Sequence, residues 1–223
     1  MTDAGSPDFV TGKKTRGIAA LMVAAGAAGF IAVALDLVFH GQLQRWDGPL
    51  HYWFHEHATP GLTLLFSAVS GLGELLVIVS IAAVVGGVLI AKKLWRTLAW
   101  WIAALCGSGI LNPALKSIFR VPRPEGLTFY VFKPDAGWSF PSGHTMAVSI
   151  TAGALALVIL HHVRMGRGRR WMAGMLVMAI SLLEAFALLY LGVHYLTDVV
   201  GGLMVSLGWL GVVRWGLPLR SVN

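Results

Sequence analysis

Three short stretches of the chain carry residue types that can hold and cleave a phosphate ester. They are residues 116–124, 141–144 and 190–198. The first contains two cations, and the second, Pro-Ser-Gly-His, can open a helix whose first N–H groups attract an anion. The second also ends in a histidine, and the third places another histidine four residues before an aspartate. This combination indicates phosphoryl chemistry at a fixed anion site.

In the first stretch, Arg123 stands between two prolines that restrict the backbone on both sides. A guanidinium can grip two phosphate oxygens at once, whereas the ammonium group of Lys116 acts as a point charge. The competing interpretation is that both cations only contact lipid headgroups.

In the second stretch, Ser142 adds a hydroxyl donor, Gly143 lets a ligand approach the backbone, and His144 lies beside whatever binds there. The competing interpretation makes Ser142 an ordinary helix N-cap and His144 a ring at the membrane interface.

The third stretch places His194 and Asp198 four residues apart, which puts them on one face of a helix. A carboxylate on one ring nitrogen fixes the tautomer and leaves the other nitrogen free to attack. The pair can instead serve only as a helix cap. Zinc is a weaker rival, because Lys116 and Arg123 would repel a cation and attract an anion.

The elements that must position these residues are membrane helices. The chain has 223 residues, of which 57% are hydrophobic and only 12% charged, with a mean hydropathy of +0.73. A soluble domain would carry more charge, and a bilayer span needs about 20 apolar residues. Six runs without ionisable groups meet this need once flanking neutral residues are counted: 17–35, 75–91, 97–115, 145–160, 171–183 and 199–213. We therefore expect an all-α fold, an integral membrane bundle of six transmembrane helices.

The pattern between the runs refines the expected layout. Residues 42–60 are aromatic and polar and suit an interfacial segment between the first and second spans. Residues 61–91 are too long for one span, so an interfacial turn or helix is expected before Gly71. We expect a disordered cytoplasmic N-terminus at 1–16, a single membrane domain at 17–216 and a cytoplasmic tail at 217–223. The expected spans are about 17–39, 71–91, 97–116, 141–162, 171–191 and 197–216.

The positive charges indicate the orientation. With six spans, twelve of the seventeen Lys and Arg residues fall on the side of the termini, which the positive-inside rule makes cytoplasmic. The net charge of +7 therefore reflects topology and attraction to anionic lipids, not a nucleic-acid partner. All three motifs fall on the opposite, extracytoplasmic face. The five cations on that face are Arg45, Lys116, Arg120, Arg123 and Lys133.

These motifs resemble those of the type 2 phosphatidic acid phosphatase (PAP2) family, membrane lipid phosphatases that share a core with vanadium haloperoxidases. The family's first motif is Lys, six residues and Arg-Pro, which fits Lys116 to Pro124. The second, Pro-Ser-Gly-His, fits residues 141–144, and the third ends in His, three residues and Asp, which fits His194 and Asp198. The resemblance covers roughly residues 46–213.

The resemblance implies a role for each matching residue. His194 would be the nucleophile that forms a phosphohistidine, Asp198 would orient it, and His144 would protonate the leaving lipid oxygen. The two histidines would start in opposite protonation states. The scheme needs no metal or cofactor, because fixed cations stabilise the transferring group. The implied phosphate ligands are Lys116, Arg123, Ser142 and the N–H of Gly143.

The third motif departs from the family at its start, where Ala187 and Leu188 replace Ser-Arg. Losing a preorganised charge contact costs a rate factor of roughly 10²–10³. Arg120, the nearest other cation in sequence, is a candidate substitute. The alternatives are an altered substrate or reduced turnover, and a degenerate member that binds lipid phosphate without cleaving it.

Four further residues are singled out by their chemistry. Glu184 lies inside an expected span, where an acid is expensive, so it either faces the site or is protonated and bonded to a neighbouring helix. His51, His55 and His57 lack an acidic partner cluster and are interpreted as interfacial rings rather than as metal ligands.

The sequence thus predicts a lipid phosphatase of a bacterial inner membrane that acts on a phosphate monoester or diphosphate. Phosphatidic acid, phosphatidylglycerol phosphate, diacylglycerol diphosphate, isoprenoid diphosphates and lipid A phosphate remain open, because the motifs bind only the phosphate. The expected partners are that lipid and the bilayer; the oligomeric state stays open. A lipid phosphotransferase is the nearest rival, followed by a lipid-binding or transport protein. A transporter would carry polar residues inside several spans, and here the spans are mostly apolar.

Overall fold

The structure is a computed structural model that describes residues 7–124 and 137–217, with side chains from residue 15 onward. The predicted tail at 217–223 lies outside this part except for Leu217, as do Lys133 and residues 1–6 of the predicted disordered N-terminus. Every regular element within these ranges is helical. The elements are α1 (Pro7–Val38), η1 (Gln44–Trp46), α2 (Asp47–Glu56), α3 (Pro60–Ser70), η2 (Gly71–Gly73), α4 (Leu75–Ala91), α5 (Trp95–Phe119), α6 (Gly143–His162), α7 (Arg167–Tyr190) and α8 (Leu196–Gly216).

Five of these helices are long and apolar enough to cross a membrane: α1, α5, α6, α7 and α8. A sixth span is possible where α3 and η2 meet α4, a pair bent by 49°. The expectation of an all-helical membrane protein is therefore confirmed. The bend lies at Gly71–Gly73, where the sequence predicted a change from interfacial segment to span.

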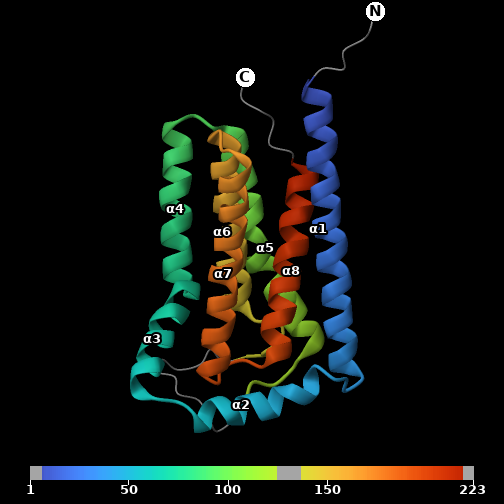
Figure 1. The fold of residues 1–223 in the computed structure, drawn as a ribbon, viewed down its shortest axis with the longest axis vertical. Coiled ribbons are helices and arrows are strands. Elements are labelled where there is room, and N and C mark those ends of the chain that lie inside the picture. The colour runs from blue at the N-terminus through green and yellow to red at the C-terminus, as the bar shows by residue number, and fades with distance from the viewer. Residues whose placement is uncertain (1–6, 125–136, 218–223) are drawn as a thin grey trace, which may run out of the picture.

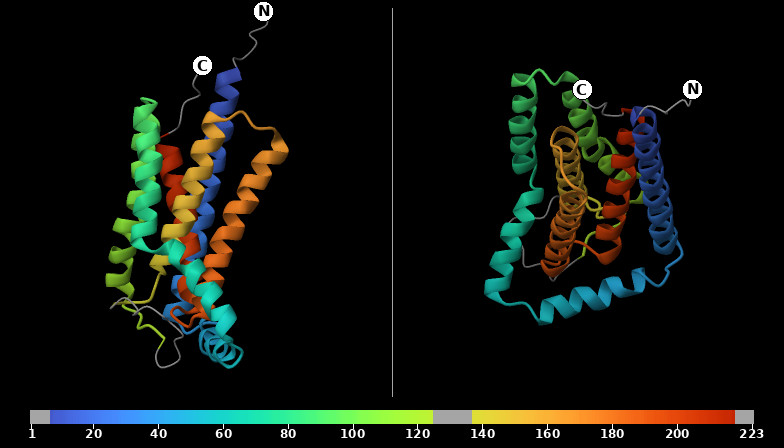
Figure 2. Two further views of the ribbon diagram at one scale, coloured as in Figure 1. Left: turned by 90° about the vertical axis from the view of Figure 1, so that its left-hand side faces the viewer. Right: turned by 45° about the horizontal axis from the view of Figure 1, so that its top comes forward.

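The long helices form an upright bundle, and α2 lies across one end of it (Figure 1). The same end carries the α7–α8 connection and the start of α6, whereas α1 begins and α8 ends at the opposite end. Two further views show the same arrangement, with α3 leading from α2 back up to α4 (Figure 2).

Close packing between α1 and α8 brings the two ends of the described chain together. It is the most extensive helix pair of the fold. Gly26 faces the backbone of Gly208, where an added Cβ would collide with it. Gly211 likewise meets the backbone of α1 at Ala19 and Val23. Small residues permit this approach in lipid, where dispersion and not water exclusion holds helices together.

Two helix boundaries differ from those predicted. Helix α1 begins at Pro7 rather than Gly17, so residues 7–16 are helical and not part of a disordered N-terminus. The polar residues there are compatible with helix, and hydropathy marks only the lipid-facing part, Thr15–Val38. Helix α5 runs on to Phe119 and ends where Arg120 adopts a left-handed conformation with φ 50°.

Candidate active site

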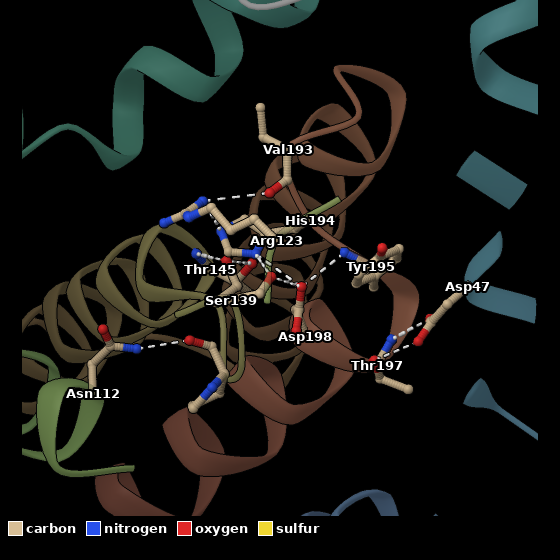
Figure 3. Close-up of polar contacts among 12 residues, drawn as sticks. Asp47, Asn112, Arg123, Ser139, Thr145, Val193, His194, Tyr195, Thr197 and Asp198 are labelled. Carbon is tan, nitrogen blue, oxygen red and sulfur yellow. Dashed lines mark hydrogen bonds and ion pairs between the residues drawn. The ribbon is translucent and has the colours of Figure 1, made fainter. Parts of the chain in front are cut away.

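The three motifs meet at the end of the bundle that α2 crosses. Lys116 lies in the last turn of α5, and Arg123 lies just after it. Ser142 caps α6, and His194 stands in the short connection from α7 to α8. Residues that are far apart in the sequence are therefore side by side in the close-up of the site (Figure 3).

His194 and Asp198 form a buried pair. Nδ1 of His194 lies 3.1 Å from Oδ2 of Asp198, and the two residues are only 2% and 0% exposed. The same oxygen accepts hydrogen bonds from the hydroxyl of Ser139 and, at 2.8 Å, from the backbone N–H of Tyr195. These donors fix the carboxylate, which in turn fixes the imidazole (Figure 3). The predicted helix-cap role of Asp198 and its pairing with His194 therefore coexist.

The other ring nitrogen of His194 faces the cation site. Its Nε2 lies 3.5 Å from Nη1 of Arg123, which also donates to the carbonyl of Val193 at 3.4 Å. Burial is the largest of the causes that lower the pKa of His194 to about 4; the charges of Arg123 and Lys116 act in the same direction, while Asp198 opposes the shift. His194 is therefore neutral at ordinary pH, with Nδ1–H directed at the carboxylate and a lone pair on Nε2.

Arg123 is half-buried, and its guanidinium retains an N–H group that can bind a ligand. Its Nε is buried and has no hydrogen-bond partner in the part of the chain that is described. Lys116 is close enough for its charge to act on His194. Arg123 thus borders the free nitrogen of the histidine, and the charge of Lys116 acts on the same ring, an arrangement that suits an incoming phosphate.

The start of α6 is held rigidly in place beside this pair. Ser142 caps the helix, its hydroxyl oxygen accepting from the N–H of Thr145 at 3.3 Å and from the hydroxyl of Thr145 at 3.1 Å. The amide of Asn112 donates to the carbonyl of Pro141 at 2.9 Å, and Asn112 also lies against Gly143. Ser142 thus performs the N-cap role predicted as its alternative, and its own hydroxyl proton is used by neither of these two contacts.

His144 lies in the first turn of α6, next to the bend between α3 and α4. Its Nε2 is 3.6 Å from Oε1 of Glu74, the separation of an ion pair rather than of a hydrogen bond. Glu184 is fully buried, and a Cβ added to Gly73 would lie 3.0 Å from its Oε1 and 2.7 Å from the His144 ring. Neither oxygen of Glu184 has a hydrogen-bond partner among the described groups, so the predicted bond to a neighbouring helix is not observed there.

Comparison with known proteins places this geometry in a family. The model of the PAP2 superfamily matches residues 97–220, more than half of the chain. The chain belongs to the PAP2 superfamily. Phosphatidylglycerophosphatase B of Bacillus subtilis (strain 168) is 26% identical over 149 residues, which are 66% of this chain and 71% of that protein.

Two solved PAP2 structures share the fold. A transmembrane PAP2-type phosphatidylglycerolphosphate phosphatase from Bacillus subtilis matches with a TM-score of 0.74 at 22% identity, over 85% of this chain and 94% of that one. LpxE of Aquifex aeolicus matches with a TM-score of 0.56 at 21% identity, over 75% of this chain and 94% of that one.

The departure from the PAP2 pattern has a structural counterpart. Leu188 is 1% exposed and belongs to an apolar cluster with Phe54 of α2 and Phe66 of α3. The position of the PAP2 arginine is thus used for packing. Arg120, the candidate substitute, is exposed and donates through Nε to the carbonyl of Ser117 at 3.0 Å. Its role as a substitute for the missing arginine stays a prediction.

The sequence motifs missed three groups of this PAP2 site. Ser139 lies just ahead of the second motif, where its polarity was the only signal. Asn112 is an amide within an apolar run, and Asp47 is one of two acids in the aromatic segment before α3. Asp47 accepts from the N–H and hydroxyl of Thr197 at 3.0 and 2.7 Å, which ties α2 to the residue before Asp198.

One of the three histidines in α2 and at its C-terminal end differs from its predicted role. His51 is buried at 8% exposure, and its ring lies edge-on to that of Tyr195 at 6.3 Å, so it is not an exposed interfacial ring. Burial and the neighbouring His55 lower its pKa. His57 is exposed and stacks on Trp53 at 4.5 Å, which suits an interfacial position.

Proposed function

We propose that this PAP2 protein is a lipid phosphatase that cleaves a phosphate monoester or diphosphate through a phosphohistidine on His194. The observation that carries the proposal is the orientation of its ring. Nδ1 is held by a buried carboxylate, and Nε2 faces Arg123, where a phosphate would bind. The lowered pKa of His194 keeps this nitrogen unprotonated and nucleophilic.

In the first step, Nε2 of His194 attacks phosphorus and the bond from phosphorus to the lipid oxygen breaks. His144 donates a proton to that oxygen, so the lipid alcohol leaves. Lys116, Arg123, Ser142 and the N–H of Gly143 stabilise the charge on the transferring group. Asp198 keeps the Nδ1 proton in place as the ring gains positive character.

In the second step, the now neutral His144 accepts a proton from water, which attacks the phosphohistidine. The P–N bond breaks, inorganic phosphate leaves, and both histidines return to their starting states. An acceptor alcohol in place of this water would give a phosphotransferase.

The site and the relatives support the proposed substrate class. The groups described bind a phosphate and leave the lipid tail to the surrounding bilayer. The curated relative and the first solved structure, both from Bacillus subtilis, are named as phosphatidylglycerol phosphate phosphatases, which supports that lipid as the first candidate. Phosphatidic acid, diacylglycerol diphosphate, isoprenoid diphosphates and lipid A phosphate follow.

The proposed placement in the membrane uses six spans, with the bent pair α3–η2 and α4 counted as one. Helix α2 then lies in the interface, where its exposed Tyr52 and Trp53 favour the headgroup region. The excess of Lys and Arg at the far end makes the termini cytoplasmic and the site extracytoplasmic, in a bacterial inner membrane.

One observation favours a second candidate. Leu188 occupies the place of a charged phosphate ligand and is buried among apolar side chains. A member with lost activity that only binds lipid phosphates would retain the remaining cations and tolerate this change.

The deciding experiment measures phosphate release from a panel of lipid phosphates and diphosphates in detergent micelles. The native protein is compared with His194→Ala, with chelator and without added metal. Release that resists the chelator and vanishes in His194→Ala supports the phosphatase and ranks its substrates. A folded native protein that binds the lipids and releases no phosphate from any of them would favour the binding role.

A further inference from the structure

Two carboxyl groups lie near the same histidine, His144, at the bend between α3 and α4. Glu74 follows the bend directly, and its carboxylate lies 3.6 Å from Nε2 of His144. Glu184 belongs to α7, and its carboxyl group and the ring of His144 both lie against Gly73. Gly73 is buried against both side chains, and any larger residue would press on the His144 ring.

The burial of Glu184 calls for a function. It is 0% exposed, and neither oxygen has a hydrogen-bond partner among the described residues. A buried carboxylate without partners costs several kcal/mol or more unless it binds a proton or a nearby positive charge compensates it. The imidazole of His144, which lies against Gly73 together with Glu184, can carry that charge.

We propose that Glu74 and Glu184 are positioning residues that hold His144 protonated and oriented as the general acid. The inference rests on the proposed function, in which His144 donates a proton to the leaving lipid oxygen. Each catalytic histidine then has its own acidic partner: Asp198 orients a neutral His194, and the glutamate pair stabilises a cationic His144.

The surroundings of the two histidines explain why their states differ. His194 is sealed from solvent, and Oδ2 of Asp198, its acceptor, is shared with two other donors. The side chain of His144 is 18% exposed, and two carboxyl groups face it. Other charged groups near the start of α6 are Lys116 of α5, Asp198 of α8 and Arg123 beyond the end of α5, and each of them acts on His194.

A general acid matters most when the leaving group is poor. The alkoxide of a lipid alcohol needs a proton as it departs, whereas nitrophenolate leaves readily without one. A change that disables His144 through its acidic partners must therefore slow cleavage of a lipid phosphate far more than cleavage of p-nitrophenyl phosphate. Purely structural damage would lower both rates together.

The test compares Glu74→Gln, Glu184→Gln and the double variant with native protein on phosphatidic acid in micelles and on p-nitrophenyl phosphate. We expect kcat for phosphatidic acid to fall at least 10-fold in each single variant and further in the double, with less than a 3-fold change for p-nitrophenyl phosphate. Glu56→Gln is the matched control, because Glu56 is exposed on α2 at the same end of the bundle, and it should leave both rates unchanged. Equal losses on the two substrates, or no loss, would overturn the proposal.

A second measurement separates this inference from the proposed function. The ¹⁵N spectrum of histidine-labelled protein reports the protonation of His144 whether or not the protein turns over. We expect an imidazolium at neutral pH in the native protein and a neutral ring in the double variant. An unchanged His144 spectrum would refute the role of the glutamates even if the phosphatase is active. The expected spectra with no phosphate release would refute only the phosphatase.

Discussion

At the scale of single residues, one carboxylate oxygen of Asp198 holds three groups of the site in place. It accepts from Ser139, from the N–H of Tyr195 and from His194. The spacing of His194 and Asp198 predicted their pairing, but the two do not share a helix face: His194 lies ahead of α8, and Asp198 contacts it from the first turn of that helix. Ser139 was not predictable, because it reaches Asp198 across 59 residues of chain and belongs to no periodic element.

The loss of the Asp198 carboxylate should lower kcat more than the loss of its donor Ser139. We expect Asp198→Asn to lower kcat by about 10³-fold or more, because the amide no longer favours the tautomer with a free Nε2. Ser139→Ala should cost about 10-fold, the equivalent of one hydrogen bond of roughly 1–1.5 kcal/mol. Steady-state kinetics on the best substrate of the panel measures both, and equal losses in the two variants would contradict this ranking.

The ionisation of His194 gives a second residue-scale prediction. With its pKa lowered to about 4 by burial, the ring should stay neutral at pH 5.5, where an unperturbed histidine would be mostly charged. The ¹⁵N spectrum of labelled protein in micelles measures this, with His194→Gln identifying the signal. A titration midpoint near 6.5 would show that the ring is solvated and not buried.

At the scale of elements, the short helix α2 is fixed to the catalytic end by a buried carboxylate. Asp47 begins α2 and binds Thr197 in the first turn of α8 through two hydrogen bonds. Aromatic composition predicted that this segment lies near an interface, but it carried no sign of a contact made 150 residues later. Amino-acid composition indicates whether a segment lies in lipid, water or the interface. Hydrogen bonds between distant segments depend on the tertiary structure and leave no sign in composition.

The Asp47 tether should make stability depend on pH. Burial raises the pKa of Asp47 from 3.8 to about 6, against the opposing hydrogen bonds from Thr197. The contribution of a raised pKa is fully present below pH 4 and is lost as pH rises through 6, a loss of up to about 3 kcal/mol. Asp47→Asn cannot ionise and should therefore gain stability relative to native protein between pH 4.5 and 7.5.

Thermal unfolding in detergent at these two pH values tests the prediction. His194 contributes with the opposite sign, since a lowered pKa stabilises the fold above pH 6.5 and that stability is lost toward pH 4. This contribution is common to native protein and Asp47→Asn and cancels in their difference. A difference that stays constant with pH would mean that Asp47 is not buried in solution.

At the scale of the whole molecule, the placement of charges predicts the topology. Arg45 precedes α2, and Lys92 lies in the turn between α4 and α5; both are exposed at opposite ends of the bundle. In a Cys106→Ala background, an impermeant maleimide should label Arg45→Cys in intact spheroplasts and Lys92→Cys only after lysis. The reverse pattern would place the active site in the cytoplasm.

Hydropathy and motif spacing predicted the helical membrane class, the positions of the long helices and the convergence of the motifs. Long apolar runs predict helices because the bilayer offers backbone N–H and C=O groups no water to bind, so they must bond to one another. It does not specify neighbours, since most helix faces are apolar. The pairing of α1 with α8 depends on glycines at matching depth, and only the assembled bundle reveals which glycines face each other.

That pairing has a consequence for biosynthesis. Of the described helices, α1 is the first to leave the ribosome and α8 the last, yet each is the other's main partner. During translation, α1 enters the bilayer before its partner has been made, so its glycine face contacts lipid. Contacts between segments so far apart in the sequence form late in folding. His194 and Asp198 arrive with that same final segment. In the proposed mechanism, a chain stalled at the end of α7 would therefore hold every phosphate-binding cation discussed above and yet be chemically inert, because His194 and Asp198 both follow that helix.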